Sequence, residues 1–463
     1  MANISIIGAG GWMFPLRLIG DLLSFPTLQN SRITLMDIDP ERLERTHHAA
    51  LELAAHHRLP TRFKATLSRR EALENADFVI ITFQVGGLEA YRIDKQIPAR
   101  YGVDQAVGDT LGPGGIMRFL RSAPEYKKIT QDMLELCPDA LLVNYANPMA
   151  MSCWYLSSLG IKTVGLCHSV QNTTHMLARA LGMPYEQIVF RSAGLNHQAW
   201  LLEFRRRHPD GSLEDLYPRL RREMVQTHLE GRAQGWTLAD SGDHTEKAQG
   251  FTDYEGGQER VRTSLMHAFG YFHTESSHHA SEYLPYFRKS PTETLEFIPQ
   301  RWDYLDICTL HEGDDHAALL GSLKAELTPS LEYGARIVVA MQGGPPTVIY
   351  GNVPNRGLIE NLPYECCVEL PCLVDASGVQ PTHIGKLPPQ LAALNRSNAS
   401  VQELAVQAAL TGKLEHVYHA LMLDPLTAAL LSLERIRAMT DELLQAQAQW
   451  LPQFALERGL QTV

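Results

Sequence analysis

The sequence lacks a long apolar run and an excess of positive charge, and both absences exclude classes of function. No apolar run reaches the length of a membrane-spanning helix, so we expect neither a membrane protein nor a membrane partner. The 41 Lys and Arg residues against 52 Asp and Glu residues give a formal net charge of −11. This balance argues against nucleic acid or an anionic membrane surface as the main partner, because both require a basic face.

A secretory leader and a disulfide pattern are also missing. Residues 3–8 already have the pattern of a strand, with no basic segment or cleavage site before them. The seven cysteines are scattered and odd in number, so we expect reduced thiols in a cytoplasmic protein. A catalytic or metal-binding cysteine is chemically possible under those conditions.

Short apolar runs alternate with helical segments through the first half of the chain. The runs that predict strands are 4–7, 33–38, 78–83, 140–145 and 163–167. Continuous apolar strands separated by helices indicate a parallel sheet covered on both faces. Ligands of such sheets bind beyond the carboxyl ends of the strands.

The pattern changes after about residue 197. The elements expected there are a hairpin around 209–211, helices at about 213–230 and 257–270, loops and short strands over 341–376, and a helical end over 401–451. A chain of 463 residues exceeds what one core usually serves. We predict an α/β protein of the lactate/malate dehydrogenase type. It has an N-terminal Rossmann-type domain over 1–196 and a mixed α+β domain over 197–463.

A Gly-rich turn follows the first strand. Gly8, Gly10 and Gly11 lie between a strand and a helix, the context in which such a turn holds a pyrophosphate. Met13 stands where the third glycine of the usual pattern would be. Asp37, after the second strand, could accept hydrogen bonds from an adenosine ribose and favour NAD. The alternative is a tight turn and a surface aspartate.

Two further segments have polar residues at loop or strand ends. Asp109 opens a Gly-rich loop over 109–115, whose N–H groups could meet a nicotinamide or a substrate, although an ordinary loop is equally consistent. Asn147 precedes Pro148 at a strand end. Its amide could hold a sugar hydroxyl, or it could simply satisfy a turn.

Cys167 and His197 form the most informative pair. A thiolate and an imidazole suit a divalent transition metal, and we expect the two residues on neighbouring strands. The alternatives are a small core cysteine and a structural histidine. His168, next to the thiol, is a candidate acid or a group that tunes the thiolate.

A second group of histidines is less informative. His273, His278 and His279 lie close in sequence to Glu275 and Glu282. By itself this pattern predicts only a polar loop.

Several ordered motifs together resemble glycoside hydrolase family 4, and most closely its α-galactosidase (melibiase) branch. The resemblance runs from residue 3 to about 290, and its motifs are Thr110–Gly115, Asn144–Pro148, Gly165–Gln171, Ala193–His197 and Phe269–Ser277. Family 4 is an NAD-dependent exception to the usual glycosidase mechanism with two carboxylates.

The resemblance implies a reaction by oxidation and elimination. NAD takes a hydride from C3 of the sugar, a base removes the C2 proton, and the C1–O bond breaks. Water then adds, and the retained NADH reduces the ketone. The resemblance also implies that Cys167 and His197 hold Mn2+, that His168 protonates the leaving group, and that Asn147 and Asn196 contact the sugar.

Other roles follow from the resemblance by position. Asp109 is expected to contact the substrate. Glu259 is the first choice for the C2 base because it lies three residues before Arg262, and Tyr254 is the second choice. Arg262 is expected to orient the substrate or the base.

Other functions stay open at this point. Within the family, the alternatives are an α-glucosidase, an α-glucuronidase and a 6-phosphoglycosidase. Outside the family, they are an NAD-dependent hydroxy-acid dehydrogenase, which would consume NAD stoichiometrically without a metal, and a non-catalytic NAD-sensing protein. The expected ligand is a small α-glycoside, and the expected assembly is a homodimer or homotetramer.

Overall fold

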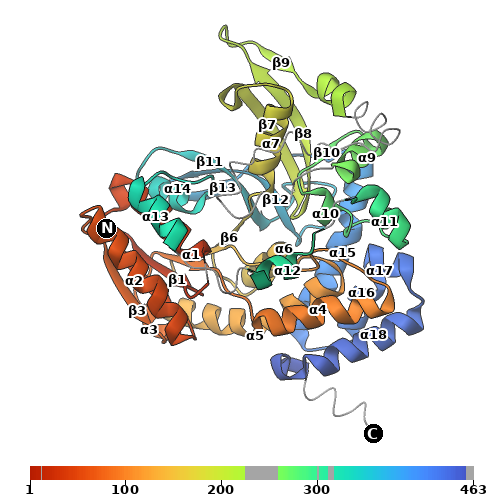
Figure 1. Cartoon of the computed structure of the whole chain (residues 1–463), viewed down its shortest axis with the longest axis horizontal. Helices are drawn as coiled ribbons and strands as arrows, with labels where there is room; N and C mark the ends of the chain where they lie inside the picture. Colours follow the sequence, from red (N-terminus) through yellow and green to blue (C-terminus); the bar gives the residue numbers. More distant parts are fainter. Residues whose placement is uncertain (12, 225–258, 300–301, 311–316, 455–463) are drawn as a thin grey trace.

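The computed structural model describes residues 1–11, 13–224, 259–299, 302–310 and 317–454. Their strands form one 13-stranded sheet in the order β10-β8-β7-β12-β11-β6-β5-β4-β1-β2-β3, with β13 beside β12 and β9 beside β8. The sheet is parallel in the half built from the first 166 residues and antiparallel in the other half (Figure 1).

The parallel half confirms the strands expected from the apolar runs. Its strands are β1 (Asn3–Ile7), β2 (Arg32–Met36), β3 (Arg62–Thr66), β4 (Phe78–Ile81), β5 (Leu141–Asn144) and β6 (Thr163–Leu166). Every residue of β4 and β5 is buried, as expected for strands covered on both faces.

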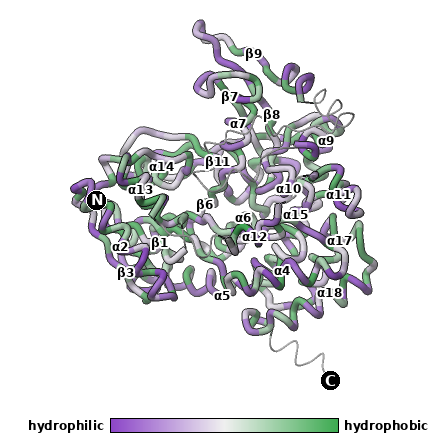
Figure 2. Tube along the Cα trace, in the orientation of Figure 1, coloured by the Kyte–Doolittle hydropathy of each residue, from purple (hydrophilic) through white to green (hydrophobic). Residues whose placement is uncertain are grey.

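Helices follow these strands and cover the parallel half of the sheet. They are α1 (Phe14–Ser24), α2 (Pro40–His56), α3 (Arg69–Leu73), α4 (Gly87–Tyr101), α5 (Gly112–Leu136), α6 (Met149–Ser158) and α7 (Ser169–Ala180). Asp39 caps α2 by accepting N–H bonds from its first turn. Figure 2 shows α2 alternating between hydrophilic and hydrophobic residues, which matches its single buried face.

The antiparallel half contains a difference from the sequence expectation. Its strands are β7 (Ile188–Leu195), β8 (Gln198–Arg207), β9 (Leu213–Asp215), β10 (Phe272–His273), β11 (Thr347–Pro354), β12 (Cys367–Asp375) and β13 (Gly378–Pro381). The expectation of loops and short strands over 341–376 is wrong, because β11 and β12 are long strands between β6 and β7. Glycine is favoured at position 351 of β11, because a Cβ there would crowd Val164 on the neighbouring strand β6 at 3.0 Å.

The region around the predicted hairpin is also resolved in detail. β8 and β9 pair antiparallel around residues 208–212, which confirms the hairpin. The helix expected from about 213 begins later, because 213–215 form β9 and the described helical residues are 217–224.

Helices pack the C-terminal part of the chain against α4, α5 and α6. The predicted helical end is confirmed by α15 (Pro389–Thr411), α16 (Glu415–Leu423), α17 (Pro425–Leu430) and α18 (Leu433–Ala446). The helices between β8 and α15 are α9 (Arg260–Phe269), α10 (Ser277–Ala280), α11 (Pro291–Phe297), α12 (Tyr304–Leu310), α13 (Ala317–Ala325) and α14 (Gly334–Met341). Together these elements confirm an α/β architecture with a Rossmann-type first half.

One main core runs through both halves of the described chain, and a smaller core lies under β8. The division proposed between residues 196 and 197 falls in the turn between β7 and β8, which pair along their length. The two proposed domains therefore share one sheet, and the division between them stays a prediction. Among the described residues, no helix is both long and apolar enough to cross a bilayer.

Candidate active site

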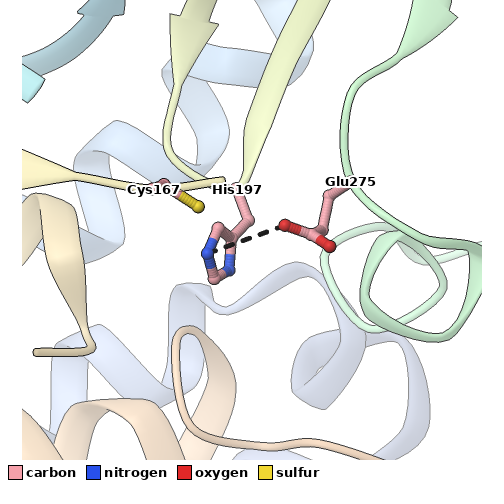
Figure 3. Close-up of side chains that lie close together, drawn as sticks. All are labelled: Cys167, His197 and Glu275. Atoms are coloured by element: carbon pink, nitrogen blue, oxygen red, sulfur yellow. Dashed lines mark ion pairs between the residues drawn. The ribbon is translucent and has the colours of Figure 1, made fainter. Parts of the chain in front are cut away.

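Three buried side chains from distant segments converge at one edge of the sheet. Cys167 follows β6, His197 lies in the turn between β7 and β8, and Glu275 follows β10. Their sulfur, nitrogen and oxygen ligand atoms all lie within 4.8 Å of one another (Figure 3). We call this group the metal cluster, since a thiolate, an imidazole and a carboxylate suit a divalent transition metal.

The expectation that Cys167 and His197 come from neighbouring strands is wrong. β11 and β12 lie between β6 and β7 in the sheet. These intervening strands place polar residues beside the site. Glu369 on β12 accepts bonds from the Nδ2 atoms of Asn196, at 3.2 Å, and Asn352, at 3.1 Å.

The His197 ring is held in the orientation that metal binding requires. Its Nδ1 lies 3.1 Å from the Thr110 hydroxyl and 3.3 Å from the Tyr283 hydroxyl. The Thr110 hydroxyl itself donates to Asp109 at 2.8 Å, so it accepts the proton of His197 Nδ1. His197 Nε2 lies on the side of the metal cluster, 3.6 Å from the nearer oxygen of Glu275. A partner that fixes the second ring nitrogen is typical of metal-binding histidines.

The charges of the metal cluster fit a bound cation. Burial raises the pKa of the Cys167 thiol to about 12, and a coordinated cation is what would deprotonate such a thiol near neutral pH. Burial also opposes ionisation of Glu275, but His279, His197 and the Ser276 N–H hold its pKa below the usual value. The carboxylate is therefore ionised without a metal.

The surroundings of His168 favour its protonated form. Its Nδ1 lies 2.9 Å from an oxygen of Glu332, a residue in the loop before α14. Burial alone would lower the pKa of His168, but the neighbouring Glu332 carboxylate raises it to about 10. A protonated imidazole next to Cys167 can act as an acid.

The predicted substrate residues are connected to the metal cluster by hydrogen bonds. Asn147 Nδ2 donates to Asp109 at 3.1 Å, and Thr110 links Asp109 to His197. Burial opposes ionisation of Asp109, but Arg118, His279 and His197 lower its pKa below the usual value. Asn147 and Asp109 thus present an amide and a carboxylate close to His197, while Asn196 precedes it directly.

Glu259 and Arg262 form a buried pair at the start of α9. The Arg262 Nε donates to Glu259, and Ser277 Oγ donates to the same carboxylate oxygen at 2.9 Å. The Arg262 guanidinium also donates to Thr173 at 2.7 Å. Glu259 is therefore a buried carboxylate in contact with Arg262, and its role as C2 base stays a prediction. Tyr254, the second choice, lies outside the described residues.

The Gly-rich turn and Asp37 lie at the same carboxyl edge of the sheet as Cys167. We call Gly8, Gly10, Gly11 and Asp37 the cofactor turn. Gly8 has φ +94° and would place a Cβ 2.7 Å from Phe83, so only glycine fits. The Asp37 carboxylate accepts the Gly10 N–H at 2.8 Å and the Asp39 N–H at 3.0 Å. This geometry fits a pyrophosphate turn with an acidic strand end.

Sequence reasoning missed the roles of Glu275, Glu332 and Glu369. Glu275 was grouped with a polar loop, although it lies in the Phe269–Ser277 motif. For Glu369, the available signal was a charged residue inside an apolar strand run. Glu332 lies in a loop with no motif, so its sequence position carried no signal.

Comparison with known proteins places the whole arrangement in a family. Residues 3–183 match the model described as family 4 glycosyl hydrolase, and residues 192–427 match the family 4 glycosyl hydrolase C-terminal domain. An alpha-galactosidase of Bacillus subtilis is 39% identical, with 98% of this chain and 100% of that protein covered. An alpha-galactosidase of Rhizobium meliloti is 35% identical, with 98% and 90% covered. An alpha-glucosidase of Erwinia rhapontici is 29% identical, with 97% and 98% covered.

Solved structures share the fold over almost the full length. The crystal structure of lplD from Bacillus subtilis has a TM-score of 0.79 at 25% identity and covers 96% of this chain and 100% of that one. A 6-phospho-alpha-glucosidase from gut microorganisms, solved with NAD and Mn2+, has a TM-score of 0.73 at 21% identity and covers 97% and 98%. The chain therefore belongs to glycosyl hydrolase family 4 and is a glycoside hydrolase.

Proposed function

We propose that this enzyme is an α-galactosidase that uses NAD and a divalent cation, with Mn2+ the best candidate. The observation that carries the proposal is the convergence of Cys167, His197 and Glu275 within 4.8 Å, at the sheet edge that also bears the cofactor turn. Two relatives that share 39% and 35% of their residues with this chain are alpha-galactosidases, which favours galactose over glucose.

The residues have distinct tasks in this proposal. Cys167 and His197 hold the cation, and Gly8, Gly10, Gly11 and Asp37 hold NAD. Bound NAD supplies a hydride acceptor and donor, and the bound cation supplies positive charge beside the sugar oxygens. All other tasks fall to side chains of this chain.

Side chains of this chain transfer the protons and orient the substrate. His168 gives its proton to the glycosidic oxygen as the C1–O bond breaks. Asn147, Asn196 and Asp109 orient the sugar hydroxyls beside the metal cluster. The base that takes the C2 proton is either Glu259, the first choice, or Tyr254.

Arg262 orients that base or the sugar, since it donates to Glu259 and to Thr173. A base must come within hydrogen-bond reach of the proton that it takes. Glu259 has the carboxylate that such a base requires, and its contact with Arg262 fixes its position. Loss of C2 exchange in a Glu259→Gln variant would identify it as the base.

The test is an omission series with p-nitrophenyl α-galactoside. The reduced enzyme is incubated with Mn2+ and NAD+, and each is then left out in turn. We expect nitrophenol release that requires both, with no bulk accumulation of NADH, because the hydride returns to the sugar. Activity that survives exhaustive removal of both would contradict the proposal, and stoichiometric NADH would indicate a dehydrogenase instead.

Substrate preference is tested with the same assay. We expect kcat/KM for the α-galactoside to be about tenfold or more above that for the α-glucoside. One well-placed polar contact can supply this discrimination. Equal or greater rates with the glucoside, a glucuronide or a 6-phosphoglycoside would reassign the sugar and leave the chemistry intact.

The assembly and cellular location belong to the same proposal. We expect a homodimer or homotetramer in the cytoplasm. Light scattering of the purified enzyme would test the first point, since a monomer at micromolar concentration would contradict it. Fractionation of the source cells would test the second.

A further inference from the structure

Glu332 is a largely buried glutamate that none of the sequence motifs includes. It lies in the loop before α14, and one of its oxygens is 2.9 Å from His168 Nδ1. Only 11% of its side chain is exposed. The Tyr145 hydroxyl, just after β5, contacts the same carboxylate, and it accepts the Gly334 N–H at 2.9 Å. Glu332 therefore connects the loop before α14 to residues that follow β5 and β6.

The loop that bears Glu332 is itself held in place. The N–H and hydroxyl of Ser330 each donate to Asp21 at 2.7 Å. The Glu332 N–H in turn donates to the Ser330 hydroxyl at 3.1 Å. Asp21 lies on α1, the helix that follows the cofactor turn. The backbone that carries Glu332 is thus fixed, and its carboxylate contacts both His168 and Tyr145.

We propose that Glu332 is the positioning residue of the leaving-group acid: it holds the His168 ring through Nδ1 so that Nε2 delivers the proton. This inference rests on the proposed function. As the C1–O bond breaks, the leaving oxygen keeps the bonding electron pair and takes the proton from Nε2. The electron pair of the former C2–H bond becomes the C1–C2 double bond. Glu332 itself touches no substrate atom.

The consequence depends on the leaving group. A nitrophenolate leaves with little protonation, whereas a sugar alkoxide requires it. General acid catalysis contributes about 10²–10⁴-fold. A Glu332→Gln variant keeps the side-chain shape but loses the charge. It should therefore slow cleavage of α-galactosyl-(1→6)-glucose by about 100-fold and of p-nitrophenyl α-galactoside by less than about threefold.

A second readout separates positioning of the acid from a general structural role. When protonation of the leaving oxygen is slow, a sugar that has lost its C2 proton is reprotonated by solvent before the bond breaks. In D2O the disaccharide recovered from the Glu332→Gln reaction should then carry deuterium at C2. Disaccharide recovered from the wild-type reaction should carry far less.

The experiment compares wild type, Glu332→Gln, Glu332→Asp and Glu326→Gln, with Mn2+ and NAD+ present. Glu326 is an exposed glutamate of the same region, so its variant controls for loss of one charge and should match wild type. Glu332→Asp keeps the charge at a shorter reach and should show a weaker form of both effects. It replaces Glu332→Gln if that variant does not fold. Unfolding temperature and NAD affinity should match wild type in every variant assayed.

The possible results distinguish the two proposals. A wild-type galactose product without deuterium at C2 would refute the elimination mechanism itself. If that product is deuterated, equal slowing of both substrates in the Glu332 variants would overturn the role of Glu332. Equal deuterium at C2 in the disaccharide recovered from wild type and from the Glu332 variants would overturn that role as well.

Discussion

The cofactor turn and the metal cluster lie at the same edge of the sheet but are built in opposite ways. Gly8, Gly10 and Gly11 form one strand-to-helix connection, and Asp37 follows the adjacent strand β2. Cys167, His197 and Glu275 come from three segments. β11 and β12 lie between β6, which precedes Cys167, and β7, which precedes His197. We expect replacing the Asp37 side chain of the cofactor turn to cost less ligand affinity than replacing a ligand side chain of the metal cluster.

The largest expected effect is the loss of the Cys167 thiolate. Cys167→Ser keeps the size of the side chain but replaces a soft ligand with a hydroxyl that ionises poorly. Mn2+ affinity should fall by more than about 100-fold, since loss of even an outer-shell partner costs roughly 10–100-fold. Titration followed by Mn2+ electron paramagnetic resonance measures this. Cys137→Ser is the control, since this buried cysteine between α5 and β5 lies outside the metal cluster. Equal affinities in both variants would contradict the account.

The next effect concerns Asp21, which links the helix after the cofactor turn to the Glu332 loop. Burial raises its folded pKa to about 6 from 3.8, so the folded state retains a proton that the unfolded chain releases. Its contribution is present below pH 3.8 and is lost as the pH rises to about 6. Between pH 4 and pH 7, wild type should lose roughly 2 kcal/mol of stability relative to Asp21→Asn.

Urea unfolding of both proteins across that range measures the Asp21 difference. Since the asparagine does not titrate, the stability of wild type minus that of Asp21→Asn should fall as the pH rises. A difference that stays constant would show that burial does not raise the pKa of Asp21.

A smaller effect is expected at Glu275, whose nearer oxygen lies 3.6 Å from His197 Nε2. Glu275→Gln removes the negative charge and should weaken Mn2+ binding by roughly 10–100-fold without sugar present. Glu360→Gln, at an exposed glutamate, is the matched control. If Glu275→Gln binds Mn2+ as tightly as the control, Glu275 serves only the packing around His279.

The smallest effect is expected in the cofactor turn. Asp37→Asn weakens two charge-assisted bonds, to the N–H groups of Gly10 and Asp39. NAD affinity should fall by about tenfold, because such bonds are worth roughly 1.5–3 kcal/mol, while Mn2+ affinity stays unchanged. Calorimetry with each ligand tests this separation, and a parallel loss of Mn2+ affinity would show that the two regions are not independent.

The same contrast explains what could be predicted from the sequence. The strand-turn-helix pattern at Gly8–Gly11 follows local rules, so its structure was expected, and the parallel strands follow from apolar runs. Cys167 and His197 were expected because thiol and imidazole have distinctive chemistry and lie in recognisable motifs. Glu275, Glu332 and Glu369 reach the site only through long-range packing. The strand that carries Glu369 has the sequence of a loop, because glycine and proline are frequent over 341–376.

Diffraction from crystals grown with Mn2+ and NAD+ tests the central claim most directly. Anomalous scattering at the manganese absorption edge locates the ion without reference to any assumed ligand. The account predicts one peak within bonding distance of Cys167 Sγ and His197 Nε2. A fully occupied peak elsewhere, with the Cys167 thiol packed against neighbouring side chains, would contradict it.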